Sequence, residues 1–287
     1  MNTLLSMLTY RRPHGSITER EFIDRFIAPI PGISTDQVGN YYLKLGSSTT
    51  AFSCHVDTMH AEEGIQRVCV AYTSGIAYAD DSSCLGADNA VGVWLLLELI
   101  KANVPGLYLF HRGEECGGIG SKHIVTLTPH LVDGIERMVA FDRKGDTDVI
   151  THQFGVQTAS MVFAEALASH LGGNYTPSSE GVYTDTLEYE HLINDCTNVS
   201  CGYNFEHTPD EYVVLRTVEQ LRDKILMIPW DELPTGARAV KIPSMLQHSY
   251  DVGYDSELHR MTYDALVKYI QNNAREIADL LIDEGLA

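Results

Sequence analysis

The sequence is organised around a short apolar strand that ends in two adjacent glutamates. Residues 107–110, Leu-Tyr-Leu-Phe, have the length and composition of a buried strand. His-Arg-Gly follows, and then come Glu114, Glu115, a cysteine and a Gly-Gly pair. Neighbouring side chains at a strand end point in different directions, so one carboxylate can hold a cation while the other faces a reacting group. A lone Glu-Glu pair is also typical of a solvated loop, so its meaning depends on the rest of the chain.

Strands and helices alternate along the chain. Apolar runs and turn residues predict strands at 37–45, 49–56, 66–72, 75–78, 107–110 and 137–142, and helices at 16–27, 91–101, 120–127, 156–171 and 216–227. The strands at 66–72 and 75–78 are expected to form a hairpin. This alternation indicates an α/β fold in which helices cover both faces of a central sheet.

The composition excludes several classes of partner. Lys and Arg number 20 against 39 Asp and Glu, which gives a net charge of −19. Nucleic acids and anionic membranes need a basic surface, so neither is an expected partner. The longest apolar run, 93–100, is too short to cross a bilayer and carries Glu98. The start lacks a signal-peptide layout and the six cysteines form no CxxC pair, which favours a reducing cytoplasm.

The last 60 residues differ from the rest. Residues 1–227 are expected to form one domain, and residues 228–287 an irregular segment followed by a helix at about 256–283. One face of that helix is apolar, with Tyr263, Val267, Ile270, Ala274, Ile277 and Leu281 at helical spacing. Such a stripe must be buried, either against the same domain or in a homodimer with a second copy of the chain.

Polar residues follow several of the predicted strands or open a predicted helix. In open α/β sheets, ligands bind beyond the carboxyl ends of the strands, so residues far apart in sequence can meet there. The residues in question are His55, Asp88, Glu114, Glu115, Asp142 and His207. Each has an ordinary alternative role by itself, as a core histidine, a helix cap, half of a surface ion pair or an exposed loop residue.

Taken together, these residues predict a site for two metal ions. Four carboxylates on one buried rim would each cost several kcal/mol if unpaired, and few basic residues lie nearby in the sequence. Two divalent cations balance the four negative charges. Nitrogen and oxygen ligands without thiolates suit zinc, with cobalt or manganese as substitutes. Asp57 lies two residues after His55, so its carboxylate is expected to accept the imidazole N–H and to orient the ring.

The same residues form an ordered set of motifs. These are His55-Val-Asp-Thr, Gly86-Ala-Asp-Asn-x-x-Gly, Gly113-Glu-Glu, a strand-end Asp142 and His207-Thr-Pro-Asp-Glu-Tyr. The set, which spans about residues 15–227, resembles the co-catalytic dizinc peptidase superfamily. That superfamily includes zinc aminopeptidases, peptidase T and acetylornithine deacetylase-type amidohydrolases.

The resemblance implies a three-layer α/β/α sandwich with a central mixed, mostly parallel sheet, and a role for each site residue. Asp88 would bridge two zinc ions, His55 and Asp142 would complete one metal site, and Glu115 and His207 the other. Glu114 would be the general base that takes a proton from the water or hydroxide held between the metals, and Asp57 would join it as a catalytic residue. The peptide bond between Asp88 and Asn89 would be cis.

The sequence also departs from parts of the superfamily. Residues 143–206 are too few for the lid domain of the deacylases and of peptidase T, so the layout is most similar to the lid-free aminopeptidases. His111, ahead of Arg-Gly-Glu-Glu, is atypical. We therefore expect an aminopeptidase acting on small peptides, in which Tyr183 or Tyr203 contacts the oxyanion. The alternatives are an amidohydrolase for N-acyl amino acids or cell-wall peptides, and a metal-binding or scaffolding protein that has lost catalysis.

Overall fold

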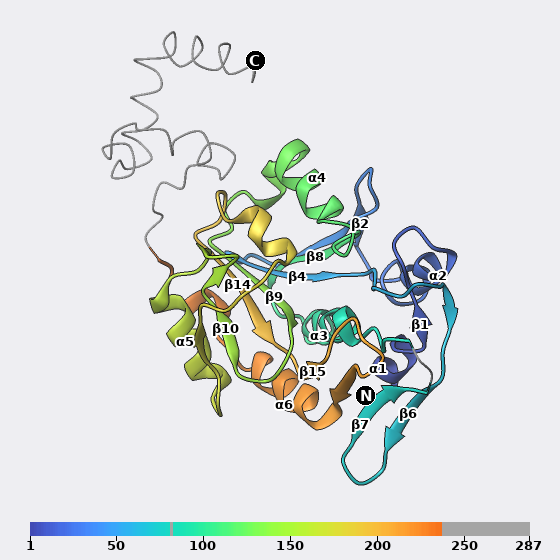
Figure 1. Cartoon of the computed structure of the whole chain (residues 1–287). Coiled ribbons are helices and arrows are strands. Elements are labelled where there is room, and N and C mark those ends of the chain that lie inside the picture. The colour runs from blue at the N-terminus through green and yellow to red at the C-terminus, as the bar shows by residue number, and fades with distance from the viewer. Residues whose placement is uncertain (81–82, 237–287) are drawn as a thin grey trace, which may run out of the picture. The chain divides into compact units, whose positions relative to one another are not determined.

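An eight-stranded mixed sheet forms the centre of the fold (Figure 1). The structure is a computed structural model that describes residues 1–80 and 83–236. The strands lie in the order β13 (Thr176–Ser178), β10 (Asp148–Ile150), β14 (Asp195–Ser200), β9 (Arg137–Arg143), β4 (Thr50–His55), β8 (Gly106–His111), β3 (Tyr41–Leu45) and β2 (Ser34–Thr35). The middle strands β14, β9, β4 and β8 are parallel, whereas β10 and β3 run antiparallel to the neighbouring middle strand. The carboxyl ends of the four parallel strands therefore share one edge of the sheet.

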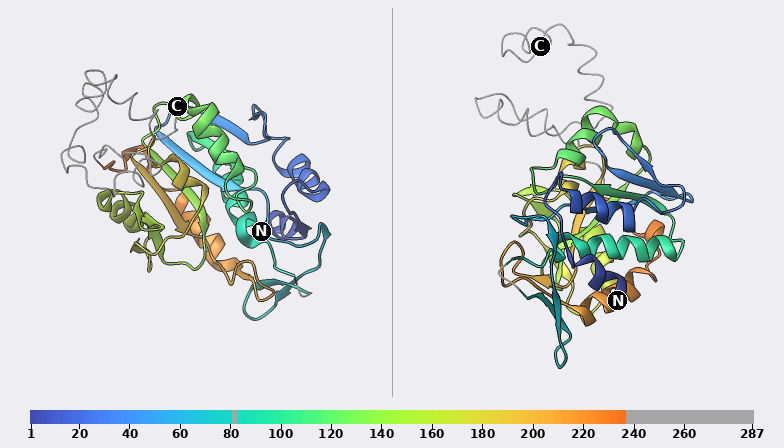
Figure 2. Two further views of the ribbon diagram at one scale, coloured as in Figure 1. Left: turned by 45° about the horizontal axis from the view of Figure 1, so that its top comes forward. Right: turned by 90° about the vertical axis from the view of Figure 1, so that its right-hand side faces the viewer.

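Helices cover both faces of this sheet (Figures 1 and 2). One face carries α3 (Ala87–Lys101), α5 (Met161–Leu171) and α6 (Leu215–Ile225), and residues of α1 (Asn2–Met7) and α2 (Ile17–Phe26) join the same core. The other face carries α4 (Ile119–Leu127) and the 3₁₀ helices η1 (Pro129–Val132) and η2 (Asp185–Tyr189). The structure confirms the predicted three-layer α/β/α fold.

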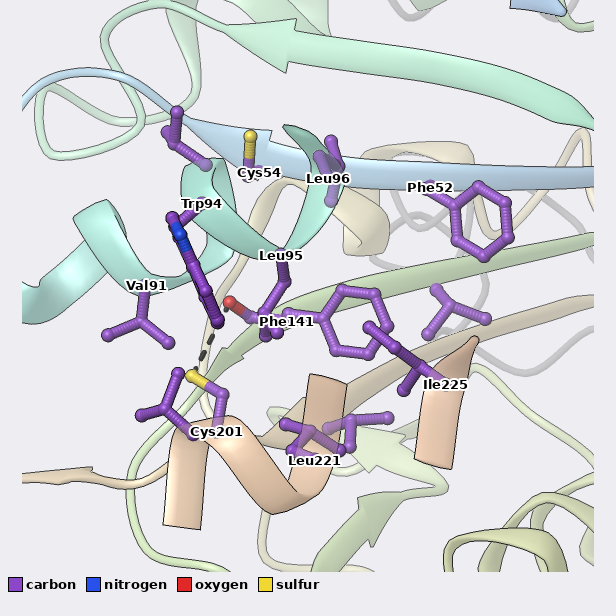
Figure 3. Close-up of a cluster of buried hydrophobic side chains, with 14 of the residues drawn as sticks. Phe52, Cys54, Val91, Trp94, Leu95, Leu96, Phe141, Cys201, Leu221 and Ile225 are labelled. Atoms are coloured by element: carbon purple, nitrogen blue, oxygen red, sulfur yellow. Dashed lines mark hydrogen bonds between the residues drawn. The ribbon is translucent and has the colours of Figure 1, made fainter. Parts of the chain in front are cut away.

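The larger core lies between the sheet and helices α3 and α6 (Figure 3). Phe52 and Cys54 alternate along β4 toward this side, whereas Ala51 faces the core under α4. Trp94 of α3 is 1% exposed and lies beside Phe141 and Cys201. Burying a large apolar side chain of this kind contributes about 1.5–3 kcal/mol, so this core fixes α3 and the residues that precede it.

Three small sheets complete the described part of the chain. One contains β15 (Tyr203–Asn204), β16 (Tyr212–Val214), β7 (Ile76–Ala79) and β6 (Val68–Ala71), in that order. The others pair β1 (Tyr10–Arg11) with β5 (Gly64–Ile65), and β11 (His152–Gln153) with β12 (Val156–Gln157). Strands β6 and β7 pair antiparallel, which confirms the predicted hairpin.

Two helices show how local signals set the element boundaries. The side chain of Ser16 accepts a hydrogen bond from the Glu19 N–H and caps α2, which confirms the helix expected at 16–27. The helix expected at 156–171 instead begins at Met161, where Ser160 caps α5 by accepting from the Phe163 N–H. Residues 156–157 belong to β12, so the predicted start of this helix was wrong.

The compact unit comprises residues 1–236, so the boundary expected at residue 227 lies inside it. Ile228, Trp230 and Leu233 are buried in the larger core, and Trp230 belongs to η3 (Trp230–Glu232). The predicted helix at 256–283 lies outside the described residues. Within the described residues, no helix combines the length and apolar character that crossing a membrane requires.

Candidate metal centre

The predicted site residues meet at the edge of the sheet where the parallel strands end. His55 is the last residue of β4, and Asp142 lies one residue before the end of β9. Glu114 and Glu115 follow β8 after Arg112 and Gly113. Asp88 lies at the start of α3, and the loop between β15 and β16 carries His207. This convergence follows from the parallel topology, which places the carboxyl ends of β4, β8 and β9 side by side.

Asp88 lies between the two histidines. Its Oδ1 is 2.9 Å from His55 Nε2, and its Oδ2 is 3.2 Å from His207 Nε2. His55 Nε2 is also 3.3 Å from Asp142 Oδ1, and His207 Nε2 is 3.0 Å from Glu115 Oε1. Two groups of possible ligands, His55 with Asp142 and Glu115 with His207, share Asp88. A third group joins His55 to Glu114 and Glu115, and the ligand atoms of each group lie within 4.8 Å of one another. The peptide bond between Asp88 and Asn89 is cis, as the resemblance implies.

Several neighbours hold Asp142 in place. Its Oδ1 accepts a hydrogen bond from Asn89 Nδ2 at 2.5 Å, and its Oδ2 accepts one from the Thr184 hydroxyl at 2.7 Å. The main-chain N–H of Asp142 donates to Asn198 Oδ1, and Asn198 Nδ2 donates to the main-chain oxygen of Asp142, each at 2.9 Å. Tyr203 is 1% exposed and its hydroxyl lies 3.4 Å from Asp142 Oδ1. Tyr203 therefore supports Asp142, and its burial leaves it unable to contact a substrate oxyanion.

Glu211 is a buried residue of the site that the sequence did not single out. Its carboxylate accepts hydrogen bonds from the main-chain N–H of Gly86 at 2.8 Å and of Asp88 at 3.0 Å. It is 1% exposed and lies four residues after His207. Glu211 therefore ties the segment that carries His207 to the start of α3. The Asp-Glu pair of the His-Thr-Pro-Asp-Glu motif is the only sequence signal, and its partner lies far away in the chain.

The Asp57 carboxylate accepts hydrogen bonds that the sequence did not predict. Its Oδ1 accepts from the N–H groups of Gly113 and Glu114, and its Oδ2 from that of Glu115, at 3.0–3.2 Å. His55 Nδ1 lies 3.1 Å from the main-chain oxygen of Asp57 but 3.6 Å from its carboxylate, too far for a hydrogen bond. The Asp57 carboxylate thus lies within ion-pair distance of the imidazole, while the turn after β8 presents three closer donors. The Asp57 carboxylate holds the loop of the two glutamates.

Glu114 differs from its neighbours because its carboxylate has no hydrogen-bond or ion-pair partner among residues 1–80 and 83–236. Burial raises its pKa to about 10 in the metal-free protein, and the carboxylates of Asp142 and Asp185 add to this effect. Burial also raises the pKa of Asp142 to about 7, with the charge of Asp88 as the next cause. Without a metal ion, Glu114 is therefore protonated at pH 7.

The residues fit two divalent cations. The side chains of Asp88, Glu115 and Asp142 are 11%, 8% and 6% exposed, so their charges need a partner. No Lys or Arg of the described ranges forms an ion pair with them or with Glu114. Each group of ligands combines one imidazole nitrogen with carboxylate oxygens, a set that suits zinc. The sharing of Asp88 matches the arrangement that the resemblance implies.

Zinc binding is expected to release more than two protons per chain at pH 7, because Glu114 and part of the Asp142 population lose protons together with the two imidazoles. Hydrogen bonds to Asp88 and Glu115 raise the pKa of His207 to about 11 in the metal-free protein. Burial opposes the charged form of His55, but Asp142 and the other nearby carboxylates outweigh it and raise its pKa well above the ordinary value. Both imidazoles are then protonated at pH 7, whereas zinc binds the neutral form. Calorimetry in buffers of different ionisation enthalpy measures the release, and an enthalpy independent of the buffer would contradict it.

The other tyrosine considered for the oxyanion lies beside the glutamate loop. Tyr183 donates a hydrogen bond from its hydroxyl to Glu188 at 3.0 Å. A Cβ on Gly118 would lie 1.8 Å from that hydroxyl oxygen, so only glycine fits there. The ring of Phe154 lies 6.5 Å away, centroid to centroid. Tyr183 thus stays a candidate for contact with the substrate, whereas Tyr203 does not.

Solved structures of peptidases are similar to this chain. An aminopeptidase PepT from Bacillus cereus superposes with a TM-score of 0.64 and 13% identity, covering 78% of this chain and 95% of that chain. A tripeptidase from Staphylococcus aureus superposes with a TM-score of 0.66 and 14% identity, and the match covers 78% of this chain and 95% of that chain. The TET1 peptidase of Pyrococcus horikoshii superposes with a TM-score of 0.56 and 16% identity, and the match covers 78% of this chain and 98% of that chain. That peptidase can assemble into a tetrahedron or a large octahedral shell.

No protein-family model matches the sequence, and no curated protein matches it either. The likeness is thus one of structure, and it spans nearly the whole length of the similar chains. It supports the resemblance to the co-catalytic dizinc peptidases that the motifs carry. The described part of this chain therefore has the fold of these aminopeptidase and tripeptidase structures.

Proposed function

We propose that this protein is a metal-dependent hydrolase that cleaves an amide bond, and specifically an aminopeptidase acting on small peptides. The observation that carries the proposal is the unpaired carboxylate of Glu114 beside two groups of ligands that share Asp88. A site that only binds metal has no use for such a carboxylate. The peptidase fold of the chain supports the same reaction class.

The residues of the chain divide the work of hydrolysis. When bound, zinc supplies Lewis acidity, which polarises a carbonyl oxygen and lowers the pKa of a water molecule. The positive charge also favours the ionised form of Glu114. Its carboxylate takes the proton of the attacking water and returns it to the nitrogen of the leaving amine. Asp57 holds the main chain of Gly113, Glu114 and Glu115, so the base stays in one position during both transfers.

Two substrates separate the proposal from its alternatives. The zinc-loaded protein is expected to hydrolyse leucyl-p-nitroanilide, which has a free amino terminus, and to leave N-acetyl-leucine intact. Hydrolysis of N-acetyl-leucine alone would indicate an amidohydrolase for N-acyl amino acids. Zinc binding without hydrolysis of either substrate or of short peptides would indicate a metal-binding protein without catalysis. The small-peptide substrate, the cytoplasmic location and a homodimer through residues 256–283 stay predictions from the sequence.

A further inference from the structure

A chain of four buried polar side chains lies beside the loop that carries Glu114. Its members are Tyr189, His111, Asp185 and Ser121, each of which is 0–1% exposed. His111 is the last residue of β8, Ser121 lies in the first turn of α4, and the other two begin and end η2. Three elements that surround the glutamate loop are thereby connected.

The contacts among these four side chains form one series, from Tyr189 through His111 and Asp185 to Ser121. The Tyr189 hydroxyl lies 2.7 Å from His111 Nε2, and His111 Nδ1 lies 3.2 Å from Asp185 Oδ2. The Ser121 hydroxyl donates to Asp185 Oδ1 at 2.5 Å. The Ser53 hydroxyl also lies 3.3 Å from His111 Nδ1, so this nitrogen has two polar neighbours. An ionised carboxylate only accepts, so the tautomer of His111 that serves Asp185 carries its hydrogen on Nδ1 and accepts from Tyr189 at Nε2. The Oδ2 atom has no hydrogen-bond partner of good geometry among the described residues, so His111 is the donor closest to serving it.

Ser121 connects this carboxylate to the glutamate loop. Its single hydroxyl hydrogen can be shared with the main-chain oxygen of Gly118, which lies 3.2 Å from Ser121 Oγ. The N–H groups of Gly117 and Gly118 in turn donate to the main-chain oxygen of Glu114, at 2.9 and 3.1 Å. Asp57 holds the opposite side of the same loop. The loop is therefore fixed between two buried carboxylates, Asp57 on one side and Asp185 on the other.

The residue before Asp185 reaches the other half of the site. Thr184 is 2% exposed and donates its hydroxyl proton to Asp142 Oδ2 at 2.7 Å. Thr184 thus contacts Asp142, and the next residue, Asp185, contacts the loop of Glu114 through Ser121. A shift of this segment would change the distance between the base and the ligand on β9. Small displacements of this kind are costly, because misplacing a catalytic group by about 1 Å can lower a rate about 100-fold.

We propose that Asp185 is a positioning residue for Glu114, and that His111 keeps the Asp185 carboxylate in place. The proposal rests on the proposed function, in which Glu114 is the general base. It explains why a histidine occupies the position before Arg112, at the end of a strand that is otherwise apolar. Asp185 acts through Ser121 and the loop, and it does not touch the substrate.

The test compares variants that break the chain at different points. Ser121→Ala removes the link to the loop with a minimal change in volume. His111→Leu removes the donor to Asp185, whereas His111→Asn keeps an N–H group near the position of Nδ1. Thr50→Val is the matched control, because it removes a buried hydroxyl at the opposite end of β4, where Thr50 contacts the Trp230 main chain.

Two readouts are measured on zinc-loaded protein. Ser121→Ala and His111→Leu are expected to lower kcat about 10–100-fold with KM unchanged. His111→Asn is expected to keep most of the wild-type kcat that His111→Leu loses. In Ser121→Ala and His111→Leu, amide hydrogen exchange across residues 113–121 should become faster, while Thr50→Val leaves kcat and this exchange as in the wild type.

Exchange that stays at the wild-type rate in Ser121→Ala would overturn the inference. Faster exchange without a fall in kcat would also overturn it, because the chain would then be merely structural. If the wild type cleaves no peptide, the proposed function fails, and the exchange data still decide whether the chain holds the loop.

Discussion

Replacing Glu114 with glutamine is expected to abolish turnover while leaving the zinc content at about two ions per chain. Glutamine keeps the size of the side chain but cannot accept the proton of the attacking water. General base catalysis contributes about 10²–10⁴-fold in rate, so kcat should fall by at least that factor. The fold should be unaffected, because Glu114 has no hydrogen-bond or ion-pair partner within the described residues whose loss would destabilise the protein.

Glu115→Gln provides the matched control for this experiment. Glu115 lies 3.0 Å from His207 and forms a group of possible ligands with His207 and Asp88. Its replacement is expected to lower the zinc content toward one ion and to reduce activity as a consequence. Kinetics and elemental analysis on both variants separate the two roles. Loss of zinc in Glu114→Gln together with full zinc content in Glu115→Gln would exchange the roles of the glutamates.

Removing Asp88 is expected to abolish the binding of both zinc ions, which is a larger effect than removing either histidine. Each oxygen of its carboxylate faces a different histidine, at 2.9 Å and 3.2 Å, so Asp88→Ala removes one ligand from both groups. His207→Ala affects only the group that His207 forms with Asp88 and Glu115. We therefore expect about two zinc ions in the wild type, about one in His207→Ala and none in Asp88→Ala after dialysis. An Asp88→Ala protein that retains one tightly bound zinc ion would show that this residue does not bridge.

Most of the fold could be predicted because the buried strands have simple signals. β4, β8 and β9 are short apolar runs that end in polar residues, and each was predicted to within one residue at either end. Helix α1 was missed because its six residues are too few to show a helical period, although Leu4 and Met7 are fully buried. The start of α5 was wrong because an apolar residue such as Val156 fits a strand as well as a helix. Tertiary pairing in β12 decided between them.

The positions of His55, Glu115 and Asp142 follow from topology, but their supporting contacts do not. Parallel strands that end at one edge bring His55, Asp142 and the two glutamates together whatever the details of packing. The partners of Asp57 and Glu211 are main-chain N–H groups in turns distant in sequence. Main-chain donors carry no sequence signal, because every residue except proline has one. The contacts from Tyr189 to Ser121 could not be foreseen either, because His111 is atypical in the motif that otherwise identifies the site.

The most direct test of the account is a crystal structure of the zinc-soaked protein with anomalous diffraction at the zinc edge. We expect two peaks about 3.5–4 Å apart. One should be bound by His55 and Asp142, the other by Glu115 and His207, and Asp88 should lie between them. The carboxylate of Glu114 should remain unbound and face the space between the peaks. A single peak, or no peak within reach of Asp88, would contradict the account.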